Sequence, residues 1–186
     1  MLDAQEYLHL AIKSSQEGQH QKALEQLRRC LDVEPGNATA TFLLAAEHAE
    51  LGMFDRAIDG MEKAINMDPD LEMAKLQLGM LYAQQGANAK AIELWSALGD
   101  ATNDPSLVLF AKGFSLLCEG QTEQAVQNLR QGMSANKKNP ALNLSIAHVM
   151  NSVETNSRLS GDDQRNDKKE ALYLGAYSGS AIGDRR

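Results

Sequence analysis

Histidines and cysteines are the side chains of this sequence that could carry metal or nucleophilic chemistry. The four histidines are His9, His20, His48 and His148, and they are dispersed along the chain. A metal site would need further ligands converging from neighbouring helices, and a packed or surface histidine explains each position more simply. We therefore expect no metal ion and no other cofactor.

The two cysteines do not form a redox or metal motif. Cys30 and Cys118 are 88 residues apart, and neither belongs to a CxxC pair. Each lies in an apolar run with helical spacing, where a thiol behaves as a small hydrophobic side chain. We expect both to be free, in a protein from a reducing compartment.

Paired acids are the remaining candidates for catalysis, and their settings argue against it. Asp68 and Asp70 flank Pro69 in a turn, while Asp162 and Asp163 lie in a polar stretch with nothing to hold them in place. The sequence contains no glycine-rich phosphate loop, no HExxH and no GxSxG motif. We therefore predict that the protein is not an enzyme.

Composition and charge narrow the class of partner. Apolar residues make up 43% of the 186 residues but aromatic residues only 5%, which suits closely packed helices rich in small side chains. The net charge of −7 repels phosphate backbones, so we expect no nucleic-acid partner. The sequence shows no apolar run long enough for a membrane span and no basic, apolar leader, so we predict no membrane insertion and a cytoplasmic location.

Internal repetition is the strongest signal in the sequence. Two residue types each recur four times at a spacing of 34 residues, with each glycine five residues before its alanine. The two series are Gly18, Gly52, Gly86 and Gly120, and Ala23, Ala57, Ala91 and Ala125. Apolar residues with helical spacing lie on both sides of each glycine. The unit is therefore a helix, a glycine turn, a second helix and a proline turn, and stacked units would form an all-α solenoid.

The repeat resembles the tetratricopeptide repeat family. The residues that carry the resemblance are the pairs Leu10-Ala11, Leu44-Ala45 and Leu78-Gly79, the alanine series, the bulky residues Leu27, Met61, Trp95 and Leu129, and Pro35 and Pro69. The resemblance implies a right-handed α-solenoid of four helix-turn-helix repeats, near residues 4–37, 38–71, 72–105 and 106–140. It implies a scaffold for other proteins and says nothing of which protein.

The fourth repeat departs from the pattern. Lys112 replaces the leucine of the first helix, and Gly132 stands where the other repeats have Cys30, Ala64 and Leu98. We expect looser packing in this repeat.

The end of the chain changes character twice. Residues 141–153 are predicted to form a capping helix, which would end a solenoid domain of residues 1–153. Residues 154–186 are predicted to be a flexible tail. Within it, the segment from Lys168 to Gly179 clusters Leu172, Tyr173, Leu174 and Tyr177, and it is either unstructured or docks on the solenoid or a partner.

In the family that the sequence resembles, the first helix of each repeat faces a concave groove. A column is the set of residues that occupy one position in successive repeats, and the columns on this side of the first helices are apolar here. Either these residues pack between repeats, or they form an exposed apolar floor of the groove. We favour the floor and predict partner binding there. The predicted partner-binding residues are Leu8, Ile12, Phe42, Ala46, Met73, Leu76, Met80, Leu107, Phe110 and Phe114.

These columns contain no Lys, Arg or Asn, so a partner's C-terminal carboxylate would find no counter-charge. We predict a non-enzymatic adaptor, similar to chaperones or assembly factors, that binds an apolar or amphipathic segment of a partner protein. The alternative is a self-associating structural protein whose groove is filled by a second copy, giving a homo-oligomer, or by its own C-terminal tail.

Overall fold

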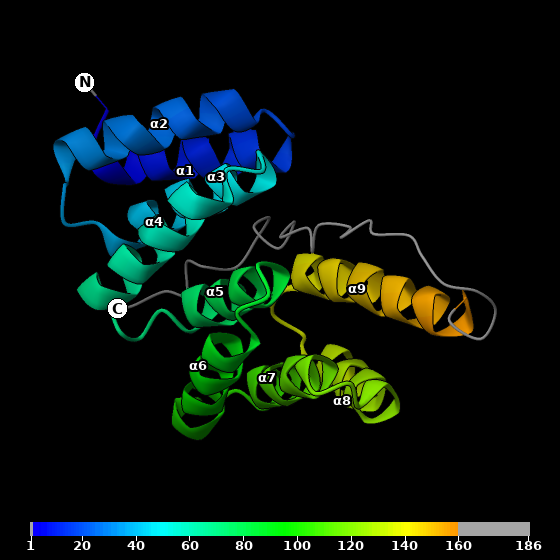
Figure 1. Ribbon diagram of the computed structural model, residues 1–186. Helices are drawn as coiled ribbons and strands as arrows, with labels where there is room; N and C mark the ends of the chain where they lie inside the picture. Colours follow the sequence, from blue (N-terminus) through cyan, green and yellow to red (C-terminus); the bar gives the residue numbers. More distant parts are fainter. Residues whose placement is uncertain (1, 160–186) are drawn as a thin grey trace. The chain divides into compact units, whose positions relative to one another are not determined.

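The computed structural model describes residues 2–159, and this part of the chain is built of helices joined by short turns (Figure 1). The helices are α1 (Ala4–Gln16), α2 (His20–Val33), α3 (Ala38–Glu50), α4 (Phe54–Met67), α5 (Glu72–Gln84), α6 (Asn88–Ala101), α7 (Pro105–Cys118), α8 (Thr122–Ala135) and α9 (Pro140–Leu159). The predicted all-α helical-repeat class is confirmed. The chain divides into two compact units between Leu78 and Gly79, within α5.

Glycine turns close the first helix of each repeat, as the sequence predicts. Gly18, Gly52, Gly86 and Gly120 all have positive φ, between 70° and 78°. This left-handed conformation is accessible to glycine without steric cost. At the first turn, the amides of Gly18 and Gln19 donate to the carbonyls of Ser15 and Ser14 at 2.9 and 2.8 Å, which closes the end of α1.

The alanine series marks where paired helices approach closely. Ala23, Ala57, Ala91 and Ala125 are all fully buried. The bulky residues four positions after these alanines are also buried. The largest of them, Trp95, packs against Gly79, where an added Cβ atom would lie 2.2 Å from Nε1 of the indole ring. Trp95 therefore fits only because residue 79 has no side chain.

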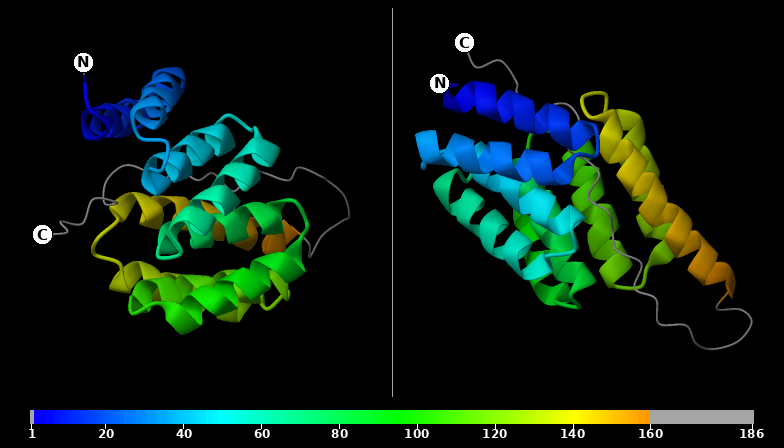
Figure 2. Two further views of the ribbon diagram at one scale, coloured as in Figure 1. Left: turned by 90° about the vertical axis from the view of Figure 1, so that its left-hand side faces the viewer. Right: turned by 90° about the horizontal axis from the view of Figure 1, so that it is seen from above.

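The first unit consists of two hairpins and the beginning of α5. α1 packs on α2, α2 on α3, and α3 on α4. The α1–α2 hairpin is visible as two helices side by side in Figures 1 and 2. A capping box begins the unit, because the amide of Glu6 donates to Asp3 while the amide of Asp3 donates to the carboxylate of Glu6, both at 2.8 Å.

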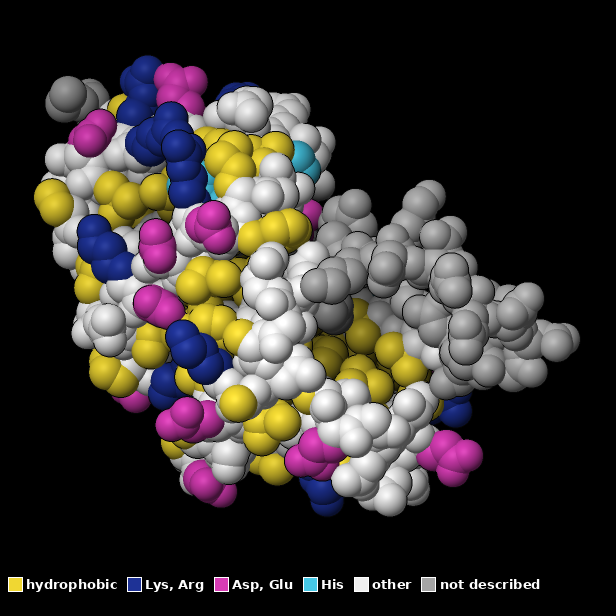
Figure 3. All heavy atoms as spheres, in the orientation of Figure 1, with side chains coloured by type: hydrophobic (Ala, Val, Ile, Leu, Met, Phe, Trp, Pro, Cys, Tyr) yellow, Lys and Arg dark blue, Asp and Glu magenta, His cyan; other side chains and the backbone are white. Residues whose placement is uncertain are grey.

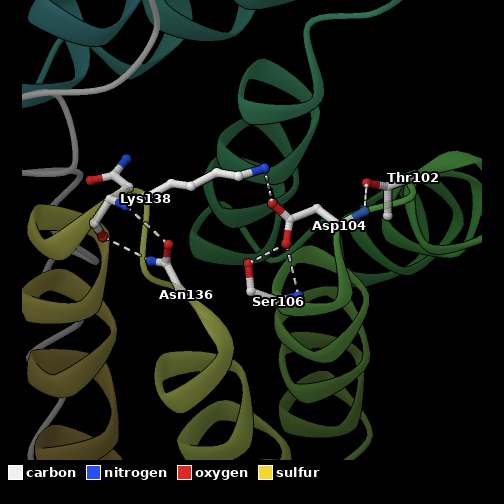
Figure 4. Close-up of polar contacts among 6 residues, drawn as sticks. Thr102, Asp104, Ser106, Asn136 and Lys138 are labelled. Atoms are coloured by element: carbon white, nitrogen blue, oxygen red, sulfur yellow. Dashed lines mark hydrogen bonds and ion pairs between the residues drawn. The ribbon is translucent and has the colours of Figure 1, made fainter. Parts of the chain in front are cut away.

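The second unit packs α6 on α7, α7 on α8, and more sparsely α8 on α9. Asp104 caps α7 by accepting hydrogen bonds from the amide and hydroxyl of Ser106, at 2.9 and 2.6 Å (Figure 4). Its other oxygen lies 3.4 Å from Nζ of Lys138, which precedes α9. Pro105 begins α7 and Pro140 begins α9, positions at which the missing N–H of proline removes no helical hydrogen bond.

The last helix is longer than the predicted cap. α9 runs past residue 153 to Leu159, and Glu154, which the sequence places in the tail, pairs with Arg130 of α8 at 2.7 Å. This ion pair links the helical extension to the preceding hairpin. The segment from Lys168 to Gly179 lies outside the described residues. The division into a domain of residues 1–153 and a tail of residues 154–186 stays a prediction.

Candidate partner-binding surfaces

The predicted partner-binding residues lie on first helices, α1, α3, α5 and α7, and the structure gives them two kinds of environment. Two of them, Ile12 and Met73, are partly exposed. The buried members are Leu8, Phe42, Ala46, Leu76, Met80, Leu107, Phe110 and Phe114. The expectation that this set forms an exposed apolar floor is therefore wrong for the buried eight, and partner binding at the set stays a prediction.

Phe110 shows the physical reason for the burial. Its side chain is 0% exposed, and a Cβ added to Gly132 of α8 would lie 2.5 Å from its ring. The ring thus occupies the space that a side chain at residue 132 would need. The fourth repeat is not loosely packed at this point, contrary to the sequence expectation, because a large residue on α7 compensates for the small one on α8.

Phe114 is buried by a second aromatic residue. Its ring stacks on Trp95 of α6, with the ring centroids 5.4 Å apart and an angle of 26° between the planes. Such offset pairs contribute beyond the area that they bury. Phe114 and Trp95 therefore join α6 to α7 inside the second unit, and neither ring is presented to a partner.

Ile12 borders a narrow recess in the first unit. The recess has a volume of about 10 Å³. It is lined by Ala11, Ile12 and Ser15 of α1, by Leu43 and Glu47 of α3, and by Leu27 of α2. A space of that size holds one water molecule and no side chain. A partner segment at Ile12 would therefore lie across the helices rather than insert between them.

A histidine–glutamate contact joins the two hairpins of the first unit. Nδ1 of His20, the first residue of α2, lies 2.9 Å from Oε2 of Glu47 on α3, and Glu47 is only 3% exposed. One turn further, burial raises the pKa of Glu50, His20 lowers it, and Glu47 raises it. The sequence analysis missed this contact, since His20 and Glu47 belong to different repeats and share no motif.

A further hollow lies in the second unit. A groove of about 720 Å³ runs between the start of α8 and the later turns of α9. Its lining is mostly polar and includes the Arg130–Glu154 ion pair, with Val126 as its one apolar side chain. Residues near Thr122 and Glu123 were not singled out from the sequence, because they carry no apolar or catalytic pattern.

The described residues hold no cluster of metal-ligating side chains, and burial disfavours ionisation of their thiols. Within residues 2–159 no group of three or more His, Cys, Asp or Glu side chains could hold a metal ion. Burial raises the pKa of the thiols of Cys30 and Cys118, which disfavours the reactive thiolate. No helix in the same part of the chain has the length and apolar character of a membrane span.

Comparisons with known proteins agree on the fold. Residues 15–76 match the family model described as tetratricopeptide repeat. A search of curated proteins finds no match in sequence.

Several solved structures share the architecture. A structure from the functional characterization of Pseudomonas aeruginosa pilF has a TM-score of 0.63 and 20% identity, covering 91% of this chain and 80% of that one. MamA 41-end from Desulfovibrio magneticus RS-1 has a TM-score of 0.58 and 16% identity, covering 86% and 97%. Cut9 in the APC/C Cut9–Hcn1 complex has a TM-score of 0.69 and 17% identity, covering 86% of this chain and 31% of that one.

At these identities the structures share the fold with this chain, and a fold does not fix a function. The repeat fold itself suggests a role in protein–protein interaction. With the family match over residues 15–76 and the four glycine-turn hairpins, the resemblance to the tetratricopeptide repeat family is confirmed.

Proposed function

We propose that this protein is a cytoplasmic, non-enzymatic adaptor that binds an apolar or amphipathic segment of a partner protein, in the manner of a chaperone or assembly factor. The family match at residues 15–76 carries the proposal, because tetratricopeptide repeats generally serve as interaction scaffolds. That match lies within the first unit. The first unit is therefore where we place the binding surface.

Within the first unit, Ile12 and Met73 are the predicted partner-binding residues that keep exposed surface. Each is apolar and lies on a first helix, so each offers an accessible contact for an apolar side chain of the partner. The buried members of the set do not contact the partner in this proposal. They pack in the core and hold the helices in position. A thioether such as that of Met73 also adapts to partners of varied shape.

The experiment that tests this function is capture of a partner by the intact protein and by the double variant Ile12→Glu, Met73→Glu. We expect the double variant to lose a specific polypeptide, identified by mass, while its far-UV circular dichroism is unchanged. Val33→Glu is the matched control, because Val33 is 49% exposed and lies on a second helix. Loss of the same polypeptide from the Val33 variant, or its retention by the double variant, would contradict the proposal.

Self-association is the alternative, and one observation favours it. Leu10 of α1 is 39% exposed, while Leu78, which occupies the same position two repeats later, is 3% exposed. Leu10 is therefore an exposed apolar side chain on α1, and a second copy of the chain is a candidate to cover it.

If self-association is correct, the mass measured by light scattering after size exclusion will rise with concentration in the micromolar range. Leu10→Glu will then return the protein to the monomer, while Val33→Glu will not. A monomer at all concentrations up to several hundred micromolar would rule this alternative out.

A further inference from the structure

The first unit has another hollow, formed by its second helices. It is a slot of about 270 Å³ between α2 and α4, with α3 as its floor. Small-molecule pockets begin at roughly 300 Å³, so the slot has room for one or two side chains rather than a whole ligand. It is separate from the Ile12 recess, with which it shares no lining residue.

Gly60 lines the slot where α4 approaches α3 closely. A Cβ atom added to Gly60 of α4 would lie 2.7 Å from the Cβ of Ala45 on α3. The two helices therefore approach closely at this point, and no side chain from residue 60 projects into the space above them.

The floor and one wall of the slot are apolar and partly accessible. Leu44 and Ala45 lie on the floor, and Leu31 of α2 forms the wall. Leu31 and Leu44 are each partly exposed, whereas Ala45 is buried. An apolar side chain entering the slot would cover the exposed parts of both leucines, which is favourable in water.

The edge of the slot is positively charged. Arg56 and Lys63 lie on its α4 side and are exposed. Neither forms an ion pair with a carboxylate in the described part of the chain. The face drawn in Figure 3 shows Lys and Arg side chains, interspersed with Asp and Glu, bordering hydrophobic ones over α2 and α4.

The side chain of His48 also lines the slot, and nearby charged groups affect its pKa. Burial lowers the pKa of its ring first, and Arg56 and Arg28 lower it further, while Glu47 acts in the opposite direction. Two cations and one carboxylate thus act on the ring. The slot is therefore locally cationic in a protein whose net charge is −7.

The repeat itself does not require this combination of residues. At the corresponding positions 68 residues later, Gln124 replaces Arg56, Gln131 replaces Lys63 and Lys112 replaces Leu44. The α7–α8 hairpin forms without those side chains. The fourth repeat thus keeps the fold without the apolar floor and the basic edge, so the fold does not require them.

We propose that this slot binds an acidic peptide segment that presents one apolar side chain. The apolar side chain lies over Leu44 and Ala45, and the flanking carboxylates pair with Arg56 and Lys63. Exposed ion pairs each contribute little to affinity, so burial of the apolar side chain supplies most of it. The charges select acidic partners and speed their association. This surface is distinct from the one proposed at Ile12 and Met73.

The test uses a fluorescein-labelled nonapeptide with a central Phe flanked by Asp and Glu, and a matched peptide with Asn and Gln in place of the acids. Fluorescence anisotropy with the full chain should show at least fivefold tighter binding of the acidic peptide at 50 mM salt. The advantage should shrink at 500 mM salt because the charges are screened. Equal binding of the two peptides, or no binding at millimolar protein, would overturn the proposal.

Charge-removal variants locate the site. The double variant Arg56→Gln, Lys63→Gln should bind the acidic peptide at least fivefold more weakly. Lys22→Gln, Lys90→Gln is the matched control, because Lys22 and Lys90 occupy the same repeat position as Arg56 and the change in net charge is the same. Equal affinity in the two double variants would place the peptide elsewhere and refute the proposal.

Nuclear magnetic resonance provides the second readout. Addition of the acidic peptide should shift the methyl signals of Leu44 and Ala45 and the ring signals of His48. Shifts confined to Ile12 and Met73 would show that the peptide uses the surface of the proposed function instead. That outcome would refute the slot and leave the proposed function standing.

Discussion

At the scale of single residues, the contact between Gly79 and Trp95 shows how two repeat positions adjust to each other. The first position is Ala11 in the first repeat and Gly79 in the third, and the second is Leu27 and Trp95. The third repeat thus combines its largest buried ring with a residue that has no side chain. A Cβ at residue 79 would lie 2.2 Å from the indole nitrogen, so the ring would have to move.

Gly79→Ala is predicted to destabilise the protein. Overpacking of a filled core costs about 1–3 kcal/mol, which outweighs the gain of up to about 1 kcal/mol from replacing a helical glycine by alanine. Urea unfolding followed by the fluorescence of Trp95, the single tryptophan, measures the change. Gly99→Ala on α6 is the control, because a Cβ there meets nothing within 4 Å, and it should be neutral or stabilising. A stabilising effect of Gly79→Ala would contradict the packing described here.

Glu50 gives the protein a pH-dependent weakness. Burial is the main cause of its raised pKa, so the folded state holds the proton more tightly than the unfolded state does. The stability from this group is present below the unfolded pKa and is lost as pH rises through the folded pKa. Above the folded pKa the ionised carboxylate therefore destabilises the fold.

Glu50→Gln is predicted to raise the urea midpoint at pH 7, with an advantage that shrinks as the pH falls to the unfolded pKa of about 4.3, below which Glu50 becomes protonated in both states. Urea midpoints across that range test it. Glu25→Gln is the control, since Glu25 is exposed and paired with Arg29 at 2.7 Å, and it should bring no gain at pH 7. A lower midpoint for Glu50→Gln than for the unchanged protein at pH 7 would refute the role of burial.

At the scale of helices, α7 and α8 are fitted to each other through Phe110 and Gly132. The ring fills the space beside the glycine, so changes at the two positions should be coupled. This fit replaces the arrangement of the other repeats, in which a side chain is present on the second helix.

Phe110→Ala is predicted to cost about 3–5 kcal/mol of unfolding free energy, because it empties a fully buried site. Gly132→Ala alone should also destabilise, but in the Phe110→Ala background its methyl group should enter the cavity and restore part of the loss. Urea unfolding followed by circular dichroism gives all four free energies of the cycle. Strictly additive effects would show that the ring and residue 132 are not in contact.

Helix order, turns and the alanine series were predictable from the sequence, because they depend on neighbouring residues and recur at a fixed spacing. The sequence did not predict which of the apolar columns remain exposed to solvent. Phe110 and Met73 both lie in apolar columns of a first helix. Phe110 is buried because its ring packs against α8 at Gly132, whereas Met73 is partly exposed. The His20–Glu47 contact was also unpredictable, since it joins two repeats through side chains that occur once.

At the scale of the whole molecule, the apolar side chains of the first helices differ in exposure. The buried members of the first-helix columns hold each unit together, as Phe114 does by stacking on Trp95. We propose that the partly exposed Ile12 and Met73 contact a partner. The unit that carries them also contains the family match at residues 15–76.

The central proposal is that an apolar segment of a partner binds at Ile12 and Met73. Calorimetric titration of the captured partner segment, re-synthesised as a peptide, tests this proposal most directly. Burial of apolar surface gives a negative heat-capacity change on binding. We predict a clearly negative value for the intact protein and for Val33→Glu, and at least tenfold weaker binding with a smaller heat-capacity change for Ile12→Glu, Met73→Glu. A heat-capacity change near zero, or identical titrations for the two variants, would contradict the proposal that an apolar segment binds at Ile12 and Met73.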